Sequence, residues 1–277
     1  MLRIEDIDTA RVRAESEGRI LDDLRWLGLD WDEGPTDGPF GPYHQSERMH
    51  LYQRALDRLT KLHLTYPCDC SRKEIVLCAS APHAGEEVIY PGTCRSRPIE
   101  RIFRRDPAKR VALDPASVVE FVDLVQGPQR VSMGEASGDF VLQRGDGVMS
   151  YQLAVAVDDA LQGITEVVRG ADLLGSTARQ IYLMRCLGFA TPRYAHSPLV
   201  LDQAGQRLAK RAHGVAVRDY RLAGIEPGRV VARLAKALGL ARDDETSLHP
   251  EQLVNRFAWS RVCPGPVFVD TSLESLF

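Results

Sequence analysis

Apolar side chains recur at helical spacing near the start of the chain. Leucine and isoleucine positions between Glu15 and Leu27 follow the period of a helix, and Gly28 can close that helix in the left-handed conformation. The stretch from Asp32 to Pro42 is polar and rich in glycine and proline, which predicts a loop. A second helix is predicted after it, with Ser46 as its N-cap. Its apolar stripe consists of Leu51, Ala55, Leu56, Leu59 and Leu62.

The pattern changes in the middle of the chain. Between Tyr66 and Arg110 the periodicity disappears while cysteine, proline and glycine become frequent, so we expect a loop-rich insertion that no apolar core holds together. Strand-like runs with turn residues between them follow. These runs are Arg110–Leu113, Val118–Val125 and Phe140–Gln143. We therefore expect an α+β insertion in this part of the chain.

The second half has the pattern of an α/β unit. Tyr151–Val157 is a buried apolar segment, and Glu166–Gly170 predicts a strand that ends in a glycine turn. Thr177 and Gln180 have the spacing of a capping box, which predicts the start of a helix that ends at Gly188. A strand, a glycine turn and a capped helix form the unit of a parallel sheet. Helical periodicity returns near the C-terminus at Val230, Val231, Leu234 and Leu238.

The composition is that of an ordinary globular protein. With 277 residues and 44% apolar side chains, the chain can bury a sizeable core. Its net charge of −3 gives no overall attraction to nucleic acid, so such binding would need a local basic patch. No apolar run approaches the roughly 18–20 residues of a membrane span, and the charged N-terminus does not resemble a signal peptide. We expect a cytoplasmic protein that does not enter a membrane.

One local basic patch exists in the predicted insertion. Seven positive charges lie between residues 95 and 110. They are Arg95, Arg97, Arg101, Arg104, Arg105, Lys109 and Arg110. Two interpretations are open: a surface that contacts nucleic acid, or a solvated loop.

The same insertion holds a candidate metal site. Four of the six cysteines lie between residues 68 and 94, which fits reduced thiols and a metal better than a disulfide framework. Three of these thiols suit zinc and leave a fourth position for tetrahedral closure. On ligand chemistry alone, His83 or Cys78 ranks above Tyr90, because a phenol with a pKa near 10 is a reluctant ligand. Free cysteines in a loop are the alternative. The three thiols are those of Cys68, Cys70 and Cys94.

Two further segments carry candidate chemistry. The basic string at residues 207–211 can fold over a triphosphate and stabilise its charge, although such strings are also common in surface turns. Tyr151 and Arg169, converging at strand ends, suit recognition of a small molecule with a carboxylate. The alternative is a buried tyrosine and an arginine paired with Asp172 or Asp158.

The first residues complete the set of motifs. Leu2–Ile4 is compatible with a strand and runs into acidic positions, which alone would suit a strand end before a helix. Taken in order, the motifs resemble those of the class I glutamyl-type tRNA synthetases, and in particular the short glutamyl-Q tRNA(Asp) synthetase family. The matching segments are Leu2–Asp8, Gln45–Arg48, the Cys68/Cys70/Tyr90/Cys94 cluster, Tyr151–Asp159, Val168–Leu173 and Arg207–Arg211.

This resemblance implies an α/β fold with the Rossmann-like parallel sheet of class I synthetases. Residues 1–66 and 146–224 would form two parts of the catalytic domain, the second with the loop that corresponds to the family's K-M-S-K-S motif. Residues 67–145 would form a zinc-bearing, acceptor-type α+β insertion, and residues 225–277 a helical C-terminal region. The cysteine cluster and the short tail distinguish this family from ordinary glutamyl-tRNA synthetases.

The resemblance also implies roles for individual residues. Glu5, Tyr151 and Arg169 would hold glutamate, and Lys210 would contact ATP and take part in catalysis. The whole ATP loop would be Arg207, Leu208, Ala209, Lys210 and Arg211. One structural Zn²⁺ would be bound by Cys68, Cys70, Tyr90 and Cys94, so the family pattern selects Tyr90 as the fourth ligand against the ranking by ligand chemistry.

The implied reaction has two steps. Glutamate attacks the α-phosphate of ATP, with Mg²⁺, to form glutamyl-adenylate, and the glutamyl group then passes to the queuosine base at the wobble position of tRNA(Asp). Positioning and charge stabilisation supply the first step. We expect a monomer whose partners are glutamate, ATP and queuosine-bearing tRNA(Asp).

The chain departs from the family pattern in three places, one of which is an interval from Cys70 to Tyr90 that is longer than usual. The family's K-[LM]-S-K is Arg207-Leu208-Ala209-Lys210, and the motifs R-F-A-P-S-P-x-G and H-x-G do not occur. We therefore expect the first strand and helix of the sheet to be missing, which would leave an unpaired edge. The leading explanation is a true start upstream. The alternatives are a catalytically inactive, zinc-containing RNA-binding paralogue and a fragment of a glutamyl-tRNA synthetase.

Overall fold

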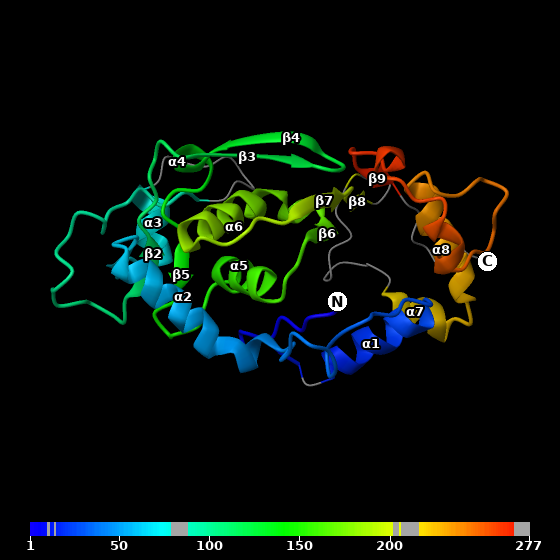
Figure 1. Ribbon diagram of the computed structural model, residues 1–277, viewed down its shortest axis with the longest axis horizontal. Coiled ribbons are helices and arrows are strands. Elements are labelled where there is room, and N and C mark those ends of the chain that lie inside the picture. Colours follow the sequence, from blue (N-terminus) through cyan, green and yellow to red (C-terminus); the bar gives the residue numbers. More distant parts are fainter. Residues whose placement is uncertain (10–11, 14, 79–87, 202–204, 206–215, 269–277) are drawn as a thin grey trace.

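The computed structural model describes residues 1–268 of the chain, except 10–11, 14, 79–87, 202–204 and 206–215. Figure 1 shows an elongated molecule with the cysteine-containing segments at one end and the C-terminal helices at the other. Between these ends lie the helices α5 (Tyr151–Leu161) and α6 (Leu174–Leu187) and the parallel strands. None of the helices in the described part of the chain combines the length and apolar content that crossing a bilayer requires.

The central sheet has the strand order β4-β3-β7-β6. The strands β6 (Glu166–Gly170) and β7 (Arg193–Ser197) pair in parallel along their whole length. The strand β3 (Val118–Asp123) lies parallel to β7 on its other side and pairs antiparallel with β4 (Gly127–Ser132). The helix α6 (Leu174–Leu187) connects β6 to β7. The predicted α/β fold with a parallel sheet is therefore confirmed.

Two central helices form most of the core. The predicted buried segment after Ser150 is α5 (Tyr151–Leu161), and the Ser150 hydroxyl caps it by accepting a hydrogen bond from the Leu153 amide at 3.3 Å. The helix α6 ends at Gly188, as predicted, with φ of +68°. The largest core cluster contains side chains of both helices, including Leu153, Ala154, Val157, Ile181, Leu183 and Met184.

The predicted capping box at Thr177 and Gln180 is wrong. The helix α6 begins at Leu174, and both residues lie inside it with buried side chains. The Thr177 hydroxyl donates back to the carbonyl of Leu173, and the Gln180 side chain accepts a hydrogen bond from Arg169. The side chains of Thr177 and Gln180 therefore make contacts inside the fold and do not cap the start of α6.

The N-terminal helices follow the predicted pattern with one correction. The helix α1 (Ser16–Trp26) ends before Gly28, whose φ is +76° as predicted. Ser46 does not cap the next helix, because it lies in a 3₁₀ turn, η1 (Gln45–Arg48), that precedes α2 (Met49–Lys61). Its hydroxyl donates instead to the Asp6 carboxylate at 2.6 Å.

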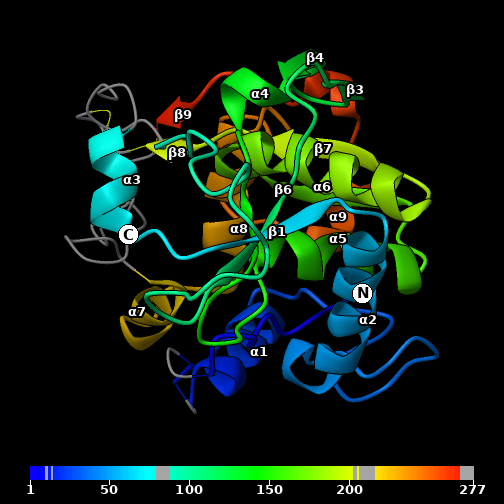
Figure 2. The same cartoon turned by 90° about the vertical axis from the view of Figure 1, so that its left-hand side faces the viewer.

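A second, three-stranded sheet lies at the cysteine end of the molecule. Its order is β1 (Thr65–Cys68), β2 (Ala108–Val111) and β5 (Val141–Gln143), all antiparallel. The helix α3 (Arg72–Cys78) follows β1, and the helix α4 (Met133–Ala136) follows β4 of the central sheet. In the end-on view of Figure 2, α2 and α3 lie on opposite sides of this region. The strands β1 and β4 were not predicted, because Pro67 and Pro128 interrupt their patterns.

The C-terminal elements pack against α1. Trp26 and Leu27 contact the cluster of Tyr220, Ile225 and Val230. The elements after β7 are β8 (Val200–Leu201), α7 (Val217–Leu222), α8 (Pro227–Ala237), α9 (Pro250–Val254), η3 (Trp259–Arg261) and β9 (Val267–Phe268). The 3₁₀ turn η2 (Ala171–Leu173) lies between β6 and α6 instead.

Candidate functional site

The first residues are fixed against the loop that precedes α2. The Ile4 amide donates to the Tyr43 carbonyl at 2.9 Å, and the Ile4 carbonyl accepts from the Gln45 amide at 3.0 Å. Gly34, with φ of +84°, approaches so closely that a Cβ there would lie 2.0 Å from the Leu2 carbonyl oxygen. These contacts hold the N-terminal segment in place and aim its charged side chains at the central sheet.

The three residues predicted to hold glutamate line one cavity. Glu5 comes from the N-terminal segment, Tyr151 from the start of α5 and Arg169 from β6. The cavity has a volume of about 400 Å³, which lies in the range of small-molecule sites. Arg3 and Asp159 complete its charged lining. The structure therefore brings together residues that lie far apart in the sequence.

Arg3 is an unpredicted member of this cavity. Its guanidinium donates to Asp159 at 2.9 Å and to Gln162 at 3.0 Å, and it lies 3.5 Å from the Glu5 carboxylate. Burial raises the pKa of Asp159, although the Arg3 charge opposes this shift. The second oxygen of Asp159, Oδ2, is buried without a hydrogen-bond partner. The cavity thus contains both signs of charge and a carboxylate oxygen that can still accept.

A buried network behind the cavity explains the Gln45–Arg48 motif. Asp158, which is fully buried, accepts hydrogen bonds from Gln45 at 2.8 Å and from Arg48 at 2.6 Å. The Tyr52 hydroxyl donates to the same carboxylate at 2.8 Å. Burying an ion pair of this kind is tolerated when every polar group finds partners. The motif therefore joins the start of α2 to α5.

Arg169 is held by neutral side chains. Its Nη2 donates to Thr177 and to Gln180, both at 2.8 Å, and its Nε donates to the His196 ring at 3.1 Å. Nη1 lies 3.5 Å from the Tyr151 hydroxyl, whose pKa burial raises. Because these partners carry no charge, none of them neutralises the guanidinium, and its positive charge can attract an anion in the cavity.

The predicted metal ligands also converge. The Sγ atoms of Cys68, Cys70 and Cys94 all lie within 4.8 Å of one another, and those of Cys70 and Cys94 are 3.5 Å apart. Thiolates held about 2.3 Å from a tetrahedral zinc lie about 3.8 Å apart, so the spacing suits such an ion. The Tyr90 hydroxyl oxygen lies 3.4 Å from the Cys68 sulfur and 3.7 Å from the Cys70 sulfur. Three sulfurs and one oxygen therefore surround a single point.

The other two candidate ligands cannot be compared with Tyr90. His83 lies outside the described residues, as does the side chain of Cys78.

The electrostatics of the cluster favour a thiolate at Cys68. Burial opposes ionisation of this thiol, but the Tyr90 hydroxyl and Arg110 together lower its pKa. The Arg110 guanidinium also lies 3.8 Å over the Tyr90 ring.

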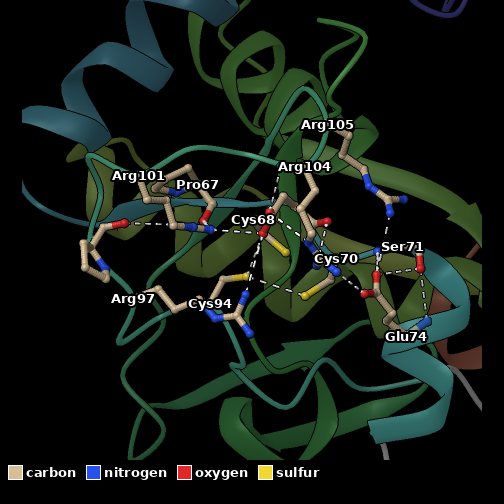
Figure 3. Close-up of polar contacts among 12 residues, drawn as sticks. Pro67, Cys68, Cys70, Ser71, Glu74, Cys94, Arg97, Arg101, Arg104 and Arg105 are labelled. Carbon is tan, nitrogen blue, oxygen red and sulfur yellow. Dashed lines mark hydrogen bonds and ion pairs between the residues drawn. The ribbon is translucent and has the colours of Figure 1, made fainter.

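Much of the basic patch is used within the protein. Figure 3 shows Arg97, Arg101 and Arg104 gathered around the segment of the first two cysteines. Arg101 donates to Asp69 at 3.2 Å, and Arg104 donates to it from both Nε and the backbone amide at 3.3 Å. Burial opposes ionisation of Asp69, but these bonds hold its pKa well below its usual range. Arg104 and Arg105 also pair with Glu74.

The predicted ATP loop, including Lys210, lies outside the described residues. The sequence interpretation named Asp158 only as an alternative partner of Arg169, whereas it pairs with Arg48, and it missed Asp123, His196 and Arg3 as members of the polar network. The burial of Asp158 could have been predicted, since Asp158 and Asp159 directly follow a long apolar run and would be buried with it. His196 gave no comparable signal, because its role depends on which strand lies beside β7.

Sequence comparisons connect this site with known proteins. The family model described as tRNA synthetases class I (E and Q), catalytic domain, matches residues 1–273. The chain is 50% identical to a glutamyl-Q tRNA(Asp) synthetase of Symbiobacterium thermophilum over 275 residues, which cover 96% of this chain and 84% of that protein. It is 39% identical to glutamate–tRNA ligase 2 of Nitrosococcus oceani, covering 98% of this chain and 58% of that protein.

A structural comparison agrees. The crystal structure of glutamate–tRNA synthetase from Elizabethkingia anophelis superimposes with a TM-score of 0.82 at 25% identity. The match covers 98% of this chain and 61% of that one. The chain thus spans about three fifths of the solved structure that it matches.

Proposed function

The chain belongs to the family of class I tRNA synthetases for glutamate and glutamine, and on this premise we propose that it activates glutamate with ATP and transfers the glutamyl group to queuosine in tRNA(Asp). The observation that carries the proposal is the convergence of Glu5, Tyr151 and Arg169 on one cavity. The identity of 50% to a glutamyl-Q tRNA(Asp) synthetase supports the choice of acceptor.

The cavity offers complementary groups for an amino acid with an acidic side chain. Arg169, with its charge unneutralised by its neutral partners and Tyr151 beside it, binds the side-chain carboxylate. Glu5 and the free oxygen of Asp159 attract the α-ammonium group. Glutamine would leave the Arg169 charge unpaired, so the cavity selects glutamate.

The chemistry needs positioning more than a protein nucleophile. An α-carboxylate oxygen of glutamate attacks the α-phosphorus of ATP, and pyrophosphate leaves with its electron pair. A hydroxyl group of queuosine then attacks the activated carbonyl carbon and AMP leaves. Lys210, in the basic loop at residues 207–211, stabilises the phosphate charge, and Mg²⁺ accompanies ATP.

The cysteine cluster holds one structural Zn²⁺ in this proposal. Cys68, Cys70, Cys94 and Tyr90 supply four donors and leave no open position for substrate. The ion would fasten β1 to the Tyr90–Cys94 loop. The protein acts as a monomer.

Glutamate-dependent exchange of pyrophosphate into ATP tests the first step. Exchange in the wild type is expected without tRNA, and Arg169→Gln should raise the KM for glutamate by about a hundredfold or more, because a charge-assisted pair is lost. Arg130→Gln is the matched control, since Arg130 is exposed on β4 and pairs with Glu120 away from the cavity. Absence of exchange from folded protein, both in this chain and in a version extended upstream in frame, would favour the inactive RNA-binding paralogue.

Transfer of labelled glutamate tests the acceptor. Queuosine-bearing tRNA(Asp) should accept the label, whereas tRNA(Asp) with unmodified guanosine and tRNA(Glu) should not. After nuclease cleavage the label should remain with the anticodon fragment. Label at the 3′ end of tRNA(Glu) would instead indicate an ordinary glutamyl-tRNA synthetase.

A further inference from the structure

We propose that His196 and Asp123 are positioning residues that orient Arg169 for glutamate, a role that rests on the proposed function. The three side chains lie on three adjacent strands of the central sheet. Asp123 ends β3, His196 lies in β7, and Arg169 lies in β6 directly opposite His196 in the strand register. A continuous hydrogen-bonded chain therefore crosses the sheet from its interior to the cavity.

Asp123 is a fixed anchor at the inner end of this chain. Its carboxylate is 1% exposed and accepts hydrogen bonds from the backbone amides of Val125 and Gln126 at 3.0 and 2.8 Å. It also accepts from the His196 amide at 3.1 Å and lies 2.6 Å from the His196 Nδ1. So many donors fix both the ionised state and the direction of the carboxylate.

The anchor determines the tautomer of His196. A carboxylate only accepts, so Nδ1 carries the proton that it receives. Arginine only donates, so the Nε2 atom of His196, 3.1 Å from the Arg169 Nε, must be the acceptor. The ring is fully buried and cannot turn to solvent. His196 is therefore a neutral acceptor at Nε2, which lies 3.1 Å from both the Arg169 Nε and the Thr177 hydroxyl.

The other contacts leave one part of Arg169 for the ligand. Nε is held by His196, and Nη2 is held by Thr177 and Gln180 of α6. Nη1 is directed to the Tyr151 hydroxyl in the lining of the cavity. Without His196 the guanidinium could rotate about the Cδ–Nε bond of Arg169 and present different nitrogens to the ligand in the cavity. Orientation, and not charge alone, would then limit glutamate binding.

Two substitutions at one position separate the halves of this role. His196→Asn keeps a donor for Asp123 but loses the acceptor for Arg169, whereas His196→Gln can return an acceptor oxygen to Arg169. In the exchange assay we expect His196→Asn to raise the KM for glutamate roughly tenfold to a hundredfold, while the KM for ATP changes less than about twofold. His196→Gln should recover most of the loss. Equal effects of both variants on both substrates would overturn the proposal.

A spectroscopic measurement keeps the test independent of activity. In ¹⁵N spectra of the wild type, His196 should show the neutral Nδ1–H tautomer, assigned by its loss in His196→Gln. The Arg169 Nε–H signal should be protected in the wild type and in His196→Gln, and lost or shifted in His196→Asn. An unchanged Arg169 signal in His196→Asn would reject the positioning role even if the wild type shows no exchange. Failure of wild-type exchange with the expected spectra would reject the proposed function alone.

Discussion

The proposed substrate cavity and the cysteine cluster are two polar sites that the same chain stabilises in different ways. Behind the cavity, charged side chains lie against the largest core cluster and are held by partners from several helices and strands. The cysteine cluster instead belongs to a small satellite core of Tyr66, Cys68, Tyr90 and Cys94. A site backed by a large core can keep its geometry without a ligand, whereas a small core of thiols needs a metal.

Removing a zinc ligand should have the largest effect. Cys94→Ser should abolish binding of zinc, which is expected at one ion per chain, because structural zinc contributes on the order of 10 kcal/mol to such sites. Hydrogen exchange should then increase in β1 and around Tyr90 but not in α5 or α6. Metal analysis and exchange mass spectrometry measure both effects. Cys263→Ser, at an exposed cysteine outside the cluster, is the control; one zinc retained in Cys94→Ser would contradict the prediction.

Breaking the buried ion pair behind the cavity should have the next largest effect. Arg48→Met leaves Asp158 charged and buried, so the free energy of unfolding should fall by about 3–5 kcal/mol in denaturant titrations. Arg130→Met removes an exposed pair with Glu120 and should cost less than about 1 kcal/mol. Similar losses in both variants would show that the two pairs are equivalent and would remove the contrast between cavity and surface.

A neutral substitution beside the cluster should have a moderate effect on metal affinity. Asp69 holds Arg101 and Arg104 beside the cluster, so Asp69→Asn, which loses the charge of these pairs, should weaken zinc binding about tenfold to a hundredfold. Competition with a chromogenic chelator measures the affinity. Glu74→Gln is the control, because it removes a charged partner of the same Arg104. This substitution should change the zinc affinity little. An equal loss in the control would assign the effect to loop folding.

The smallest effect should be a pH dependence of stability from His196. Burial lowers its pKa; Asp123 opposes the shift and the Arg169 charge adds to it. As pH falls below about 6.5, the unfolded histidine binds a proton before the folded one, so stability declines by at most about 1.4 kcal/mol per pH unit until the folded group titrates. His196→Gln should show a shallower decline below about pH 6.5 in unfolding titrations. Identical curves would mean that His196 is not held neutral.

The two regions also differ in how far the sequence predicts them. The cysteine spacing placed three thiols together, because their segment is short and their chemistry is specific. The family resemblance then brought Glu5, Tyr151 and Arg169 together as candidate residues, which spacing alone could not do. The polar groups behind the cavity depend on strand order and helix packing. Thr177 illustrates the limit, since its spacing predicted a helix start and its hydroxyl instead contacts Arg169.

The hydrogen bond between Arg3 and Gln162 spans 159 positions of the chain, and the bond between Arg48 and Asp158 spans 110. During synthesis on the ribosome, Arg3 and Arg48 therefore lack their partners Gln162 and Asp158 until α5 has emerged. Contacts of such long range slow folding, and they form only after local helices and hairpins have appeared. The cavity is accordingly a late product of folding, and in a nascent chain that stops before α5 the Arg48 side chain, which is buried in the folded protein, remains exposed.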